Sequence, residues 1–69
     1  MDISAKIRAA CGATRISEAE LSRRIGTTPQ AFSSRMKTAK FSSAELEMIA
    51  EALGVKYVAY FELPDGTKL

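Results

Sequence analysis

The 69-residue sequence contains one cysteine, Cys11, and neither histidine nor tryptophan. A lone cysteine excludes an intramolecular disulfide, and the lack of histidine and of a cysteine cluster argues against a structural metal. There is no apolar run long enough to span a membrane, and the first ten residues, MDISAKIRAA, lack the apolar core and cleavage site of a secretory signal. We therefore expect a cytoplasmic protein with no metal, no other cofactor and no membrane partner.

Catalytic machinery is missing as well. The sequence offers no histidine base, no nucleophile beside a positioned base and no glycine-rich phosphate loop. Its length leaves room for one small hydrophobic core, so we expect a single domain that is not an enzyme. Apolar burial in so small a domain barely exceeds the loss of chain entropy, and oligomerisation is the stabilising device that the composition leaves open.

The formal net charge is only +2, but the charges are segregated along the chain. Residues 21–44 carry five basic side chains and no acidic one, whereas residues 45–65 carry five acidic side chains and one lysine. A basic middle segment suits a polyanionic partner such as a nucleic acid, although an unevenly charged solvated surface gives the same pattern.

The first half of the chain carries the cap signals of two helices. Asp2 can begin a first helix, and Gly12 is expected to end it. Ser17 and Glu20 have the spacing of a capping box, in which each side chain binds the backbone amide of the other, and they predict the start of a second helix. Gly26 is expected to end that helix after about two turns.

Two further helices follow in the same way. Thr28 is placed to cap a third helix, with Pro29 at its first position, where a missing N–H costs nothing. Ser42 and Glu45 repeat the capping box at the start of a fourth helix, and Gly54 ends it. Apolar residues at helical spacing in these segments predict the core. The predicted core residues are Leu21, Phe32, Leu46, Ile49 and Leu53.

After the fourth helix the pattern changes to β-branched and aromatic residues. Residues 56–62 therefore predict a strand, and the turn sequence Pro64-Asp65-Gly66 allows residues 67–69 to return as a short hairpin. The sequence thus predicts a mostly α fold, a bundle of about four helices in residues 1–55 followed by a C-terminal β-strand or short hairpin in residues 56–69.

Residues 16–38 have the organisation of a helix-turn-helix, two short helices joined by a tight glycine-containing turn. In that motif the second helix lies in the DNA major groove. With Phe32 and Met36 turned inward, the outward side chains of the third helix are polar or basic, and none is acidic. Glutamine can pair with adenine, serine with any base, and lysine with guanine or phosphate. The outward residues are Gln30, Ser33, Ser34 and Lys37.

The stretch ISEAELSRRIGTTPQAFSSRMKT resembles the helix-turn-helix of bacteriophage Cro proteins and lambdoid repressors, members of the XRE family, and the later SSAELEMIAEALGV resembles the core helix that follows it. The resemblance covers roughly residues 3–55. It implies a lambda-repressor-like bundle that binds double-stranded DNA and regulates transcription. The chain departs from the family at Glu18, where glutamine is frequent, at Pro29, which removes a base-reading side chain, and at Lys37-Thr38-Ala39-Lys40, which lacks the usual Asn-Gly.

The charge pattern, the outward face and the resemblance together give two predicted sets of DNA contacts. The resemblance contributes Thr28, Gln30 and Ser34 to the first set, and Ser17, Thr38 and Lys40 to the second. The predicted base-reading residues are Thr28, Gln30, Ser33 and Ser34. The predicted backbone-binding residues are Ser17, Arg23, Arg35, Lys37, Thr38 and Lys40.

The C-terminal strand is the predicted dimerisation segment, because an isolated strand leaves its backbone groups unpaired and a second copy is the simplest partner. Small Cro proteins dimerise through such a strand, which the resemblance extends to this chain. The alternative is a hairpin packed on its own helices in a monomer. The predicted dimer contacts are Tyr57, Val58, Tyr60, Phe61 and Leu63.

Two functions follow from this sequence. The first is a Cro-like transcriptional repressor that binds a palindromic operator as a homodimer. The second is an antitoxin or accessory interaction module of the same fold, in which the acidic fourth helix or the C-terminal segment binds a protein partner.

Overall fold

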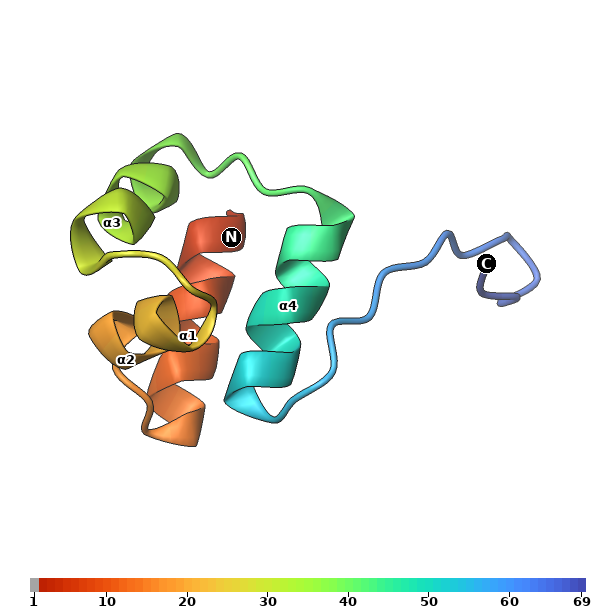
Figure 1. Cartoon of the computed structure of the whole chain (residues 1–69). Helices are drawn as coiled ribbons and strands as arrows, with labels where there is room; N and C mark the ends of the chain where they lie inside the picture. The colour runs from red at the N-terminus through yellow and green to blue at the C-terminus, as the bar shows by residue number, and fades with distance from the viewer. Residues whose placement is uncertain (1) are drawn as a thin grey trace.

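A computed structural model describes residues 2–69 and contains four α-helices (Figure 1). In Figure 1, α1 and α4 lie next to each other, α2 and α3 lie together beyond α1, and the chain after α4 leads away from the helices. The mostly α bundle predicted from the sequence is confirmed. None of the helices in this part of the chain is long and apolar enough to cross a membrane. The helices are α1 (Ile3–Thr14), α2 (Glu18–Arg24), α3 (Pro29–Thr38) and α4 (Ser43–Leu53).

Each helix begins at the cap that the sequence predicted. A side-chain oxygen of the cap accepts a hydrogen bond from the backbone amide three residues later, at 2.8–3.1 Å in all four helices. In α4 the bond is reciprocal, because the Ser42 amide donates to Glu45 Oε1 at 2.9 Å. The four caps are Asp2, Ser17, Thr28 and Ser42.

The predicted end of the first helix at Gly12 is wrong. α1 continues to Thr14, whose hydroxyl donates to the Ala10 carbonyl at 2.8 Å, and the chain turns at Arg15, which adopts a left-handed conformation with φ 58°. A single glycine inside a helix costs only about 1 kcal/mol, and the buried face of α1 outweighs it. The other two predicted ends are close to the observed ones, since Gly26 and Gly54 take the positive φ that a helix terminus needs.

The core lies between the four helices and includes all five predicted core residues. Leu21 in α2 is completely buried, and Cys11 in α1 packs in the same cluster as a small apolar filler. Burial is the main factor that raises the pKa of the Cys11 thiol, which keeps it protonated. The buried apolar cluster consists of Ile7, Cys11, Leu21, Phe32, Met36, Leu46, Ile49 and Leu53.

The predicted strand over residues 56–62 is not formed. Residues 55–61 have no regular secondary structure. The only β pairing within residues 2–69 is one antiparallel bridge between Glu62 and Lys68, beside which Phe61 and Leu69 exchange backbone hydrogen bonds, and it is closed by the turn that begins at Pro64. A strand needs a partner for its backbone groups, and the helices offer no sheet edge to residues 55–61. The β-forming composition therefore produces an extended segment with a narrow hairpin at its tip (Figure 1).

We expect truncation of the core to destabilise the domain severely. Ile49→Ala, at a side chain that is 5% exposed, should lower the free energy of unfolding by about 2–5 kcal/mol, because it leaves a cavity in the buried apolar cluster. Its neighbour Met48 is 52% exposed, and Met48→Ala should change the stability by less than about 1 kcal/mol. Urea unfolding followed by circular dichroism measures both values, and equal midpoints would contradict the core assignment.

Candidate nucleic-acid interface

α2 and α3 are joined by a four-residue turn over residues 25–28. Gly26, with φ 81°, reverses the chain, and the Thr27 amide donates to the Ser22 carbonyl at 2.9 Å to close the end of α2. Leu21 and Ser22 are both fully buried beneath this turn, so the two helices pack directly on each other. The small Ser22 side chain permits this close approach, and its hydroxyl donates to the Ala19 carbonyl of its own helix at 2.6 Å.

α3 has one buried side and one exposed side. Phe32 and Met36 are 3% and 4% exposed, as the sequence predicted. The predicted outward residues are all exposed, and their spacing of three and four places them on one face of the helix. We call this surface the α3 face. It consists of Gln30, Ser33, Ser34 and Lys37.

The three predicted contact residues at helix ends are exposed, but their hydroxyl groups differ in what they can still offer. Ser17 and Thr28 accept a cap hydrogen bond at 3.0 and 3.1 Å, so each retains its O–H as a donor. The Thr38 hydroxyl donates to the Arg35 carbonyl at 3.0 Å, so it can only accept a further bond. Ser17 and Thr28 are therefore able to donate a hydrogen bond to a phosphate or a base. Thr38 cannot donate one while its hydroxyl is bound to the Arg35 carbonyl.

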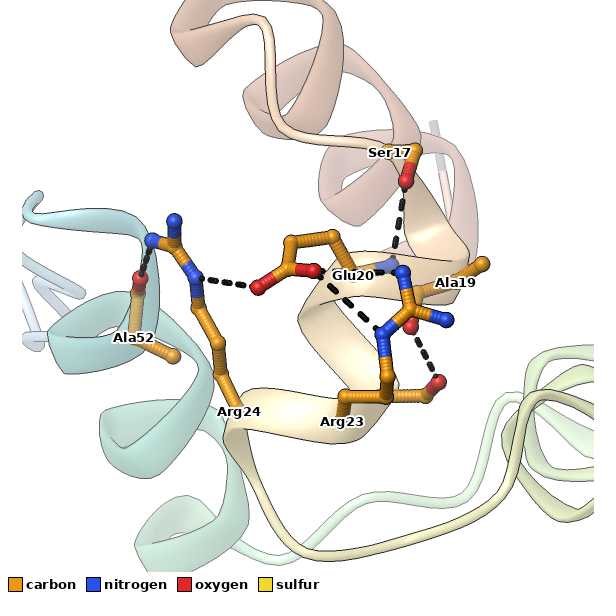
Figure 2. Close-up of polar contacts among 7 residues, drawn as sticks. Ser17, Ala19, Glu20, Arg23, Arg24 and Ala52 are labelled. Carbon is orange, nitrogen blue, oxygen red and sulfur yellow. Dashed lines mark hydrogen bonds and ion pairs between the residues drawn. The ribbon is translucent and has the colours of Figure 1, made fainter.

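Two of the five cations of the basic segment are bound to Glu20 on the surface of α2. Figure 2 shows the Glu20 carboxylate between Arg23 and Arg24, with ion-pair distances of 3.1 Å to each. The hydrogen bond from Arg24, followed by that from Arg23, lowers the pKa of Glu20. The predicted capping box at Ser17 is thus only half formed, because the Glu20 side chain binds two guanidinium groups instead of the Ser17 amide.

Arg24 also links α2 to α4, which the sequence did not indicate. Its Nη1 atom donates to the Ala52 carbonyl at 2.9 Å (Figure 2). Ala52 lies in the last turn of α4, where carbonyls lack helical partners and the helix dipole favours a cation. Arg24 therefore acts as a cap for α4, and it is turned to the side of the bundle rather than to the α3 face.

Arg35 is likewise held by the protein itself. It forms an ion pair with Glu45, donates to the Lys40 carbonyl at 2.9 Å, and lies over the Phe41 ring with 5.1 Å to its centroid. These contacts fix the loop between α3 and α4. Glu45 is the central acceptor of this group, and hydrogen bonds from the Ser42 amide and then from Arg35 lower its pKa.

The cations that remain for an external partner are Lys37 and Lys40. Both are exposed, and neither takes part in an ion pair within residues 2–69. Lys37 lies on the α3 face and Lys40 in the loop that follows. The structure thus brings Gln30, Ser33 and Ser34 together on one face of α3, with Thr28 exposed at the start of that helix. Lys37 shares this face, Lys40 follows in the loop, and Arg23 and Arg35 are engaged in ion pairs within the chain.

We expect the Arg35–Glu45 contact to add a pH-dependent component to stability. Because the folded-state pKa of Glu45 is lowered, its contribution is present above the ordinary glutamate pKa of 4.5 and is lost as the pH falls through the lower folded value. Glu45→Gln keeps the shape of the cap but not the charge, so its Tm should be below wild type near neutral pH and approach it at about pH 3.

The matched control is Glu47→Gln, at an exposed carboxylate of the same helix with no ion pair in the described chain. Thermal melts of the three proteins from about pH 7 to about pH 3 measure the difference. If Glu45→Gln and wild type differed equally at all pH values, the charge of Glu45 would have no such role.

No protein-family model, curated protein or solved structure is significantly similar to this chain. The function is therefore inferred from the exposure, hydrogen-bonding capacity and charge of the side chains described above.

Proposed function

We propose that the protein binds specific sequences of double-stranded DNA through a helix-turn-helix formed by α2, the turn and α3, and that it acts as a Cro-like transcriptional repressor. The observation that carries the proposal is the α3 face: it is exposed, it has no acidic side chain, and it belongs to the second of two short helices joined by a tight turn. In a helix-turn-helix this is the helix that enters the major groove.

The dimensions and chemistry of α3 suit that groove. Ten residues give a helix of roughly 15 Å, and the major groove is about 12 Å wide. Gln30, Ser33 and Ser34 lie in the first two turns, which approach base edges most closely. An amide and two hydroxyls can both donate and accept, so this face can distinguish base pairs by their hydrogen-bonding pattern.

Phosphate binding is assigned to groups that the protein leaves available. Lys37 and Lys40 follow the base-reading residues and would meet the sugar–phosphate backbone beside the groove. Ser17, at the start of α2, retains an O–H that can donate to a phosphate on the other side. Such contacts fix the position of α3 on the duplex without reading its sequence.

Dimerisation through the C-terminal segment completes the proposal. All five predicted dimer residues are exposed, including Phe61 at 80% and Val58 at 66%, which is unfavourable for a monomer in water. Residues 56–60 form no backbone–backbone hydrogen bond within the described chain, so a second copy related by a two-fold axis can supply the missing strand. Two α3 helices about 34 Å apart would then read successive major grooves of a palindrome, and the bound dimer would occlude a promoter.

Selection on random DNA duplexes tests the proposal directly. We expect enrichment of one palindromic sequence. With that duplex, Gln30→Ala should weaken binding by about 1–3 kcal/mol and relax the preference at one base position in each half-site. Lys40→Ala should weaken binding to all duplexes alike and reduce the log–log salt dependence by roughly one unit for each lysine lost. Glu47→Gln, at an exposed residue of α4 that is not part of the α3 face, serves as the control for both.

Failure to enrich any sequence would overturn the proposed function. If a site were enriched but Gln30→Ala left its affinity and base preference unchanged, DNA binding would stand and the assignment of α3 as the reading helix would be wrong.

The dimer has its own test. Phe61→Glu should shift sedimentation equilibrium at micromolar concentration from dimer to monomer, because a carboxylate cannot be buried at an apolar interface without a partner. Met48→Glu places the same charge at an exposed apolar residue of α4 and should leave the dimer intact. A wild-type monomer, both free and on DNA, or unchanged association of Phe61→Glu, would contradict dimerisation through this segment.

A further inference from the structure

Ser4 is a polar residue on the buried face of α1. It shares that face with Ile7 and Cys11, at spacings of three and four, and only 3% of its surface is exposed. A hydroxyl in such a position must form a hydrogen bond, because a buried polar group without a partner costs stability. A small apolar residue would pack equally well at this position, so packing alone does not explain why a hydroxyl group is present.

The partner of this hydroxyl lies 32 residues away, in the helix assigned to DNA reading. Ser4 Oγ donates to the Met36 carbonyl at 2.6 Å, in a buried environment. Met36 is in the last turn of α3, where carbonyls have no helical amide to bind. The chain leaves the helix at Ala39, which is left-handed with φ 54° and whose own amide binds the Arg35 carbonyl. Ser4 therefore caps the C-terminal end of α3 from another helix.

This bond adds a direct link to α1 at an end of α3 where Met36 packs in the core and Arg35 binds Glu45 of α4. α3 packs chiefly on α2, whereas Ser4 connects the C-terminal end of α3 to α1. Ser22, the other buried serine, makes a useful contrast, because its hydroxyl binds Ala19 within its own helix and joins nothing together.

We propose that Ser4 is a positioning residue that fixes the orientation of α3 and thereby the sequence specificity of the α3 face. The inference rests on the proposed DNA-binding function. Base-edge contacts need donors and acceptors placed to within about 0.5 Å, and the loss of one directional contact at a helix end can permit a tilt larger than that. Phosphate contacts from flexible lysines tolerate such a tilt, so loss of the Ser4 bond should reduce specific binding and spare non-specific binding.

The first measurement needs no DNA. Ser4→Ala removes the hydroxyl and leaves the Met36 carbonyl buried without its partner, so Tm should fall by about 5–10 °C. Ser22→Ala, the matched control, should have a much smaller effect. Hydrogen exchange read by NMR should show amides of residues 36–40 accelerating more in Ser4→Ala than amides of α4, because the end of α3 opens locally.

The second measurement uses the duplex selected with the wild-type protein and an unrelated duplex, at a temperature where all variants are folded. Ser4→Ala should bind the selected duplex about five- to tenfold more weakly, a factor that corresponds to the net free energy of about one hydrogen bond. Its affinity for the unrelated duplex should change less than about twofold. The slope of log affinity against log salt should stay at the wild-type value, because no phosphate contact is lost. Ser22→Ala should keep the wild-type ratio between the two duplexes.

The outcomes separate the inference from the function on which it rests. If the wild type selects no duplex, the proposed function fails and the inference fails with it, whatever hydrogen exchange shows. If the wild type selects a duplex but Ser4→Ala loses affinity equally on both, Ser4 only stabilises the fold. Uniform acceleration of exchange throughout the helices would also overturn a local role at the end of α3.

Discussion

The burial of Leu21 and Ser22 in α2 is the constraint on which the rest of the structure depends. α2 has only seven residues, too few to be stable as an isolated helix, and it packs against α1, α3 and α4. Its two central side chains have no exposed surface at all. From this packed helix the turn at Gly26 leads to α3, of which one face covers the core and the other meets solvent.

Features set by neighbouring residues could be predicted from the sequence. All four helix starts follow from a cap residue and the amide three positions later, and the buried residues follow from helical periodicity. The exposure of the α3 face follows in turn, since Phe32 and Met36 fix which side of α3 is inward.

Features in which a side chain or segment has several possible partners could not be predicted from the sequence in the same way. Glu20 had the spacing of a capping box, but two arginines at i+3 and i+4 supply charge-assisted bonds that are stronger than one neutral amide can offer. The strand over residues 56–62 failed for a related reason, because its residue types favour β structure but the described chain supplies no strand to pair with residues 56–60. Ser4 left one signal in the sequence, a polar residue within an apolar stripe, and its acceptor was identifiable only from the fold.

Charge counting overstated the basic character of the middle segment. Three of its five cations are paired with Glu20 or Glu45, and those two acids lie just outside the basic run or at the start of the acidic one. What remains on the side of α3 is a set of neutral hydrogen-bonding groups with Lys37 and Lys40 beside them. This division suits sequence reading, because neutral groups discriminate between bases whereas lysines attract any phosphate.

Each polar contact between distant parts of the chain involves the end of a helix. Ser4 binds a carbonyl in the last turn of α3, Arg24 binds one in the last turn of α4, and Arg35 binds Glu45 in the first turn of α4. Apolar packing is non-directional, so it favours contact between helices without specifying their exact relative directions. Hydrogen bonds have narrow limits on distance and angle. At a helix end, a hydrogen bond restricts the tilt of the whole helix more than a contact near its middle does. These polar contacts therefore fix the relative directions of helices that the core holds in contact.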